Sequence, residues 1–265
     1  MPAQTKAGRP PGNPGVRRAL TAYGLAAFTE FATWLAILLV AYREGGPALV
    51  GVASIAMLVP GIILIPLIAG VGDRMPRSRA LALAYASVAV TSALAGVLLL
   101  VDAPFWTVLA VGAVLNVGVG LVRPMHFAAL PLLATRPGEV VTANAVSSSL
   151  EGVATFVGFL SAGILTDYLG AWTVLVMCAG LASVAVLLTI GLNTPVAPVD
   201  PGDVPGRIWA ALAGFSSLRR NPGAVALLIL LAIMSVVEGA NDTLTVTFND
   251  QVLGSTESTA GLIAG

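Results

Sequence analysis

Residues 70–79 read Gly70-Val71-Gly72-Asp73-Arg74-Met75-Pro76-Arg77-Ser78-Arg79 and form nearly the only dense charge cluster in the first two hundred residues. The cluster lies between two apolar runs, of which one ends at Gly72 and the other begins at Ala80. A short charged loop between two long uncharged segments predicts two membrane-spanning helices joined by a tight connection at the membrane surface.

The bulk composition excludes a water-soluble globular protein. The chain is 57% hydrophobic and 10% charged, with a mean hydropathy of +0.93, whereas soluble proteins carry about 25% charged residues. So few charges cannot cover the surface of a soluble domain of this size. The net charge is zero, and we expect no nucleic-acid partner. The composition predicts a protein embedded in the lipid bilayer.

Seven segments satisfy the requirement of about 20 mostly apolar residues for a membrane-spanning helix. They are residues 19–41, 45–72, 80–101, 103–134, 140–166, 172–192 and 222–237, the last continuing through Glu238 and Asp242. Residues 254–265 resemble the opening of an eighth span. We therefore expect the chain to be either a fragment of a longer protein or a natural truncation.

The basic residues predict the orientation of these spans. Eleven of the 13 lysines and arginines fall in alternate connections or in the N-terminal segment, the exceptions being Arg43 and Arg123. Lys and Arg concentrate on the cytoplasmic side of membrane proteins. This predicts a multi-pass protein of the cytoplasmic (inner) membrane with a cytoplasmic N-terminus.

Four regions are expected along the chain. Residues 1–18 are polar, basic and rich in Pro and Gly, which indicates a disordered cytoplasmic tail. Residues 19–192 form a six-helix transmembrane bundle. Residues 193–221 form a cytoplasmic linker, whose later part has the pattern of a helix lying at the membrane interface. Residues 222–265 begin a second bundle.

The loop at residues 70–79 resembles the signature loop between helices 2 and 3 of the major facilitator superfamily. Asp73 and Arg74 match its Asp-Arg core and Arg77 matches a basic position, while Ala69 and Pro76 stand where the family has glycine. The resemblance implies an all-α membrane fold of six-helix halves, each built from two inverted three-helix repeats. It also implies that Asp73, Arg74 and Arg77 act as a conformational latch. The alternative is a basic loop that only sets the topology.

Further stretches resemble the drug and siderophore exporters of this superfamily. They are Arg123-Pro124, Leu130-Pro131, Ala143-Asn144-Ala145 and residues 157–163, in which Phe159 replaces the proline of the antiporter motif. The resemblance implies a secondary transporter with a small-molecule substrate, working by alternating access. Independently of it, small residues recur every four positions at Ala154, Gly158, Ala162 and Thr166, a spacing that allows close approach of membrane helices.

Charged side chains within the spans are candidate functional residues, because an unpaired charge in the bilayer is costly. They are Glu30, Arg123, Glu151, Glu238 and Asp242. Arg123 could pair with Glu30 or with Glu151, as a switch operated by protonation or as a static pair that fixes the packing. If the spans are arranged as in the superfamily, three of these residues would approach the central cavity: Glu30, Arg123 and Glu238.

Two further residues, Trp34 and Asn116, are candidate substrate contacts. We interpret the lone His126 and the lone Cys178 as packing residues. No phosphate-binding loop, nucleophile arrangement or Cys/His metal spacing occurs in the sequence, so we expect neither an enzyme nor a cofactor.

The sequence therefore predicts a proton-coupled exporter of a small amphipathic molecule, drug-like or siderophore. Uptake or exchange of a metabolite, lipid flipping, and a truncated non-transporting scaffold are the alternatives.

Overall fold

The computed structural model describes residues 13–72, 75–192 and 194, with isolated helical positions between 222 and 237. The described ranges up to 194 contain helices and short connections without a strand. The helices are α1 (Pro14–Gly72), α2 (Arg77–Leu100), α3 (Phe105–Leu133), α4 (Pro137–Leu169) and α5 (Ala171–Thr189). All five are long and apolar enough to cross a membrane. The all-α membrane fold that the sequence predicts is confirmed.

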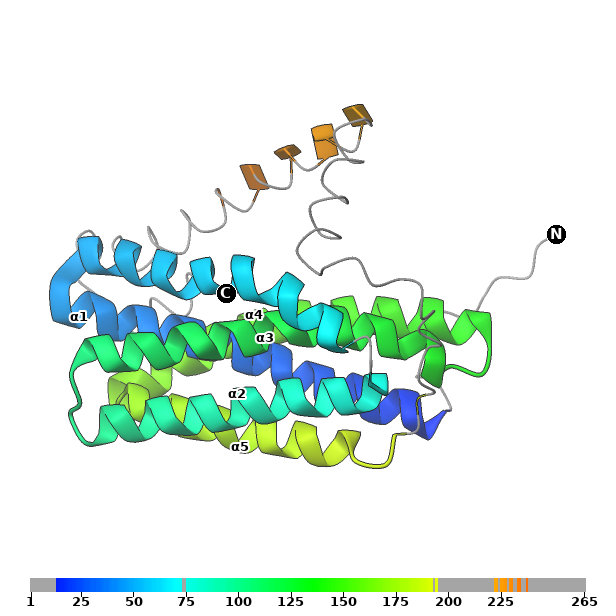
Figure 1. Ribbon diagram of the computed structural model, residues 1–265. Helices are drawn as coiled ribbons and strands as arrows, with labels where there is room; N and C mark the ends of the chain where they lie inside the picture. The colour runs from blue at the N-terminus through cyan, green and yellow to red at the C-terminus, as the bar shows by residue number, and fades with distance from the viewer. Residues whose placement is uncertain are drawn as a thin grey trace.

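Helix α1 is two membrane crossings joined by a tight reversal. Its 59 residues include two non-helical positions, Gly45 and Gly46, and Gly46 has φ 65° and ψ −160°. A positive φ of this kind is readily adopted only by glycine, so the chain turns back here (Figure 1). The described residues therefore make six crossings, at the positions of the first six predicted spans.

One end of the bundle collects the start of α1, the α3–α4 connection and the end of α5 (Figure 1). Three hydrogen bonds fasten this end. The side-chain amide of Asn13 donates to the carbonyl of Leu133 at 2.7 Å, and the Arg18 guanidinium donates to the carbonyl of Ile190 at 2.6 Å. The backbone N–H of Ser78 donates to the Thr194 hydroxyl at 2.9 Å. The basic residues of the predicted cytoplasmic side that the structure describes belong to segments at this end.

The predicted boundary of the N-terminal tail at residue 18 is wrong, because α1 already begins at Pro14. The side chain of Asn13 accepts a hydrogen bond from the N–H of Gly15 at 2.9 Å. Asparagine before the first turn and proline as the first helical residue both favour a helix start. Val16 is fully buried in a cluster with Leu130 and Leu192, so this turn is part of the bundle. Residues 1–12 lie outside the described residues.

Small residues set the distances between the helices. Helix α1 packs on α3, α4 and α5, and α2 packs on α3 and α5. A Cβ atom at Gly158 of α4 would lie 3.1 Å from the carbonyl oxygen of Phe28 in α1. The close helix approach predicted for the small-residue face of residues 154–166 is therefore confirmed.

The outer surface of the bundle is apolar. On α2, for example, Leu83 is 60% exposed and Val90 is 66% exposed. Backbone polar groups along such helices bond within the helix, so these faces suit the hydrocarbon of a bilayer.

Candidate functional site

Three helices bring the candidate polar residues to one region of the bundle. Tyr23 and Glu30 lie two turns apart on α1, and Ser147 and Glu151 lie one turn apart on α4. Arg123 and His126 lie three residues apart on α3. Each spacing places the two side chains on one side of a helix. We call these six residues the polar cluster.

Glu151 is the centre of the polar cluster. Its Oε1 forms an ion pair with the guanidinium of Arg123. Its Oε2 accepts a hydrogen bond of 3.2 Å from the hydroxyl of Tyr23. Both carboxylate oxygens of Glu151 are therefore engaged, one by a cation and one by a neutral donor. Charge-assisted hydrogen bonds of this kind are stronger than those between neutral groups.

A layer of rings lies against this ion pair. The Tyr23 and His126 rings stack with centroids 4.1 Å apart and an interplanar angle of 12°. Phe127 packs edge-on against both rings. The Nε2 of His126 lies 3.0 Å from the hydroxyl oxygen of Ser147, and both residues are fully buried. The layer fixes Tyr23, and through it the carboxylate of Glu151.

Glu30 is half-buried and is acted on by the charges of both Arg123 and Glu151. Among the residues that the structure describes, Arg123 forms its ion pair with Glu151 and not with Glu30. When all three groups are ionised, Glu30, Arg123 and Glu151 together carry one more negative than positive charge. A second carboxylate so close to an existing ion pair gives the cluster capacity for one further cation or proton.

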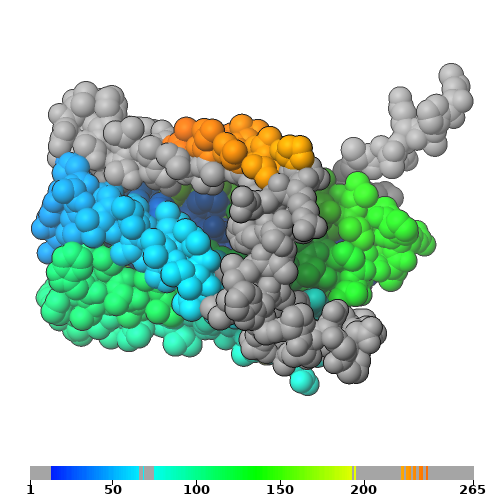
Figure 2. Space-filling view, turned by 45° about the horizontal axis from the view of Figure 1, so that its top comes forward, coloured from blue at the N-terminus to red at the C-terminus, as the bar shows by residue number. Residues whose placement is uncertain are grey.

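The cluster lies deep along the helices and is open on one side. Arg123 is ten residues from the end of α3 at Leu133, and Glu151 is fourteen from the start of α4 at Pro137. At 1.5 Å per residue these separations are roughly 15 and 21 Å, against a hydrocarbon core about 30 Å thick. The Arg123 side chain is 48% exposed and that of Glu151 is 24% exposed. Figure 2 shows part of the first crossing of α1, in dark blue, recessed behind the second crossing, in light blue to cyan.

A family model described as Major Facilitator Superfamily matches residues 19–265. The chain belongs to the major facilitator superfamily. The chain matches none of the curated proteins with which it was compared. Major facilitator proteins are transporters rather than enzymes, so the protein is a multi-pass membrane transporter with a small-molecule substrate. The recognition of the superfamily from the loop at residues 70–79 is confirmed.

Several predicted site residues of this major facilitator protein lie outside the polar cluster. Arg77 is the first residue of α2 and is half-buried. The other two predicted latch residues, and the two acidic residues of the seventh span, lie outside the described residues. They are Asp73, Arg74, Glu238 and Asp242.

The two candidate substrate contacts lie in helix packing. The side-chain amide of Asn116 on α3 donates to the carbonyl of Met57 in the second crossing of α1, at 3.1 Å. Trp34 is partly buried against the main apolar core, one turn beyond Glu30. Contact of either residue with a substrate stays a prediction.

Tyr23 is the member of the cluster that the sequence did not reveal. A tyrosine near the start of a span is usually an interfacial aromatic residue, and here it is only 2% exposed. Its separation of seven residues from Glu30, which places both on one helix face, was the available signal.

Proposed function

We propose that the protein exports a small amphipathic molecule, drug-like or siderophore, in exchange for protons by alternating access. The proposal includes a location in the cytoplasmic (inner) membrane with the N-terminus in the cytoplasm. The observation that carries it is the Arg123–Glu151 ion pair with Glu30 beside it, at a depth where charges are costly. The sequence resemblance to drug and siderophore exporters supports the direction.

The excess carboxylate provides the coupling. With Arg123 held by Glu151, the cluster has one acidic group in excess, which takes up either a proton or the cationic group of a substrate. Proton uptake by Glu151 would release Arg123 to pair with Glu30 instead. An element with two alternative pairings and nearly equal energies is what a proton switch requires.

Other predicted residues act at the periphery of this mechanism. Glu238 and Asp242 would add acidic groups from the seventh span. Asp73, Arg74 and Arg77 would hold the cytoplasmic side closed as a latch. Trp34 and Asn116 are the candidate substrate contacts.

The test is a proton-flux assay in proteoliposomes with cationic dyes and siderophores as substrates. We expect substrate-dependent proton movement in the unaltered protein and its loss in Glu30→Gln and Glu151→Gln. Glu44→Gln is the matched control, because Glu44 is exposed and lies beside the Gly45–Gly46 reversal. The proposal fails if both cluster variants keep transport and its pH dependence.

A second outcome separates coupling from transport itself. If the folded protein moves a substrate down its gradient without moving protons, the protein is an uncoupled transporter and the assignment of Glu30 and Glu151 is wrong. The membership in the superfamily would be unaffected.

A further inference from the structure

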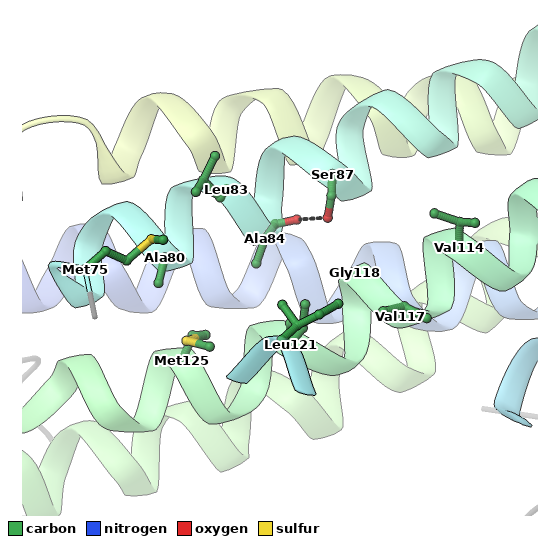
Figure 3. A pocket seen from close by; sticks show the side chains of 11 residues that line it. Met75, Ala80, Leu83, Ala84, Ser87, Val114, Val117, Gly118, Leu121 and Met125 are labelled. Atoms are coloured by element: carbon green, nitrogen blue, oxygen red, sulfur yellow. Dashed lines mark hydrogen bonds between the residues drawn. The ribbon is translucent and has the colours of Figure 1, made fainter. Parts of the chain in front are cut away.

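An apolar groove runs along the outside of the bundle between α2, α3 and Ile68 of the second crossing of α1. Its buried floor, which includes Leu121 and Met125, belongs to the packing cluster that also contains Tyr23. Its volume is about 340 Å³, at the lower end of the roughly 300–1,000 Å³ typical of small-ligand sites. Met75 and Met125 line one end, and Ser87 and Val114 line the other (Figure 3). The wall on α3 runs from Val114 to Met125, eleven helical steps or roughly 16 Å at 1.5 Å per residue. The groove is therefore long, narrow and parallel to the helices.

The lining of this groove offers a ligand almost nothing but hydrocarbon. The hydroxyl of Ser87 donates to the carbonyl of Ala84 at 2.8 Å, within its own helix (Figure 3). Leu83 and Val114, one on each wall, are 60% and 58% exposed. These side chains belong to the apolar outer surface of the bundle, so the groove opens toward the acyl chains of the bilayer.

The end of the groove at Met75 and Ala80 lies at a basic rim. Arg79 is exposed and adjoins Ala80, which lines the groove. Arg77 and Arg79 both lie in the first turn of α2. Basic residues at the membrane surface attract anionic lipids. The apolar groove and the basic rim thus meet at the start of α2, where the membrane surface is expected.

We infer that the groove binds one acyl chain of an anionic phospholipid whose phosphate lies beside Arg79. The length, direction and apolar lining of the groove suit an acyl chain, and the rim supplies the charge that a headgroup phosphate requires. A peptide segment fits less well, because its backbone polar groups would find no hydrogen-bond partners in this lining. The inference does not depend on the identity of the transported substrate.

The experiment is native mass spectrometry of the delipidated full chain in detergent, titrated with phosphatidylglycerol or with phosphatidylcholine of the same acyl chains. We expect one phosphatidylglycerol to be retained in preference to phosphatidylcholine. Arg79→Gln should weaken phosphatidylglycerol binding about fivefold, the effect of one basic residue near a membrane surface, and leave phosphatidylcholine binding unchanged. Arg136→Gln, an exposed arginine outside the groove, is the matched control.

Groove-filling variants test the apolar part separately. Leu83→Trp and Val114→Trp place bulk in the groove from opposite walls, and both should reduce binding of both lipids. Val90→Trp is the control, because Val90 is exposed on α2 and does not line the groove. The inference is overturned if phosphatidylglycerol is not preferred, if each control acts like its partner, or if the filled grooves bind lipid as before. Unchanged lipid binding by Leu83→Trp and Val114→Trp would also be expected if a segment of this chain, and not a lipid, occupied the groove.

Discussion

Replacing Gly158 by alanine tests the packing that holds α4 against α1. A methyl group there would lie 3.1 Å from the carbonyl oxygen of Phe28, 3.2 Å from the Cβ of Phe31 and 3.4 Å from the backbone nitrogen of Ala32. Two of these three atoms are backbone, so they can give way only if α1 itself moves. No flexible side-chain end lies among these three nearest atoms, so the added methyl group cannot be accommodated by a change of rotamer.

The expected size of the effect follows from two opposing contributions. Overpacking of this kind lowers stability by about 1–3 kcal/mol, while alanine in place of glycine within a helix gains up to about 1 kcal/mol. Gly152, on the same helix, has no atom within 4 Å of an added Cβ, so Gly152→Ala shows the helical gain alone. Gly158→Ala should be less stable than Gly152→Ala by about 1–3 kcal/mol.

The assay is unfolding of the full chain by sodium dodecyl sulfate in mixed micelles, followed by circular dichroism. Comparing the two alanine variants removes the helix-propensity contribution, which both share. Equal free energies of unfolding for Gly158→Ala and Gly152→Ala would refute the close contact between α4 and α1.

Three further predictions concern other parts of the bundle. In the same unfolding assay, Asn13→Ala should lower stability by about 0.5–2 kcal/mol through loss of the helix cap, and no change would show that the cap contributes nothing. Arg123→Gln should destabilise the protein more than the Arg123→Gln/Glu151→Gln double variant, because the single change leaves the half-buried carboxylate of Glu151 without its cation; additive effects in the double-mutant cycle would contradict the ion pair. Glu44→Cys and Arg136→Cys should react with a membrane-impermeant maleimide from opposite sides of sealed vesicles, with Arg136→Cys labelled from the cytoplasmic side, since the one native cysteine is buried. Labelling of both from the same side would contradict the three crossings between them, and labelling of Arg136→Cys from outside would contradict the orientation.

The crossings of this fold were predictable because they depend on local chemistry. Mostly apolar runs of membrane length, separated by short connections of which alternate ones are basic, predict each of the six crossings between residues 14 and 189 without knowledge of their packing. The start of α1 was missed because Asn13 and Pro14 lie in a polar, proline-rich context that masked a helix start. Tertiary burial of Val16 stabilises that first turn, and burial is not visible in composition.

The site was predictable in its charged members and not in its pairing. Glu30, Arg123 and Glu151 were evident because ionisable residues are rare within spans. Whether Arg123 meets Glu30 or Glu151 depends on how three helices are rotated about their axes, and only the structure shows the contact with Glu151. The support that Tyr23 gives to Glu151 was not predicted, because an aromatic residue near the end of a span resembles ordinary interfacial packing.

The hydrogen bonds that fasten Asn13 to Leu133, Arg18 to Ile190 and Ser78 to Thr194 have a mechanical consequence. Helices that are bonded to one another at one end resist sliding past their neighbours, so a force on one helix rotates the whole bundle. We expect the six crossings to behave as a single lever whose hinge lies outside the bundle. The conformational change of transport would then be a rigid-body tilt of the bundle. The polar cluster would move with it, roughly 15 Å from the hydrogen-bonded end.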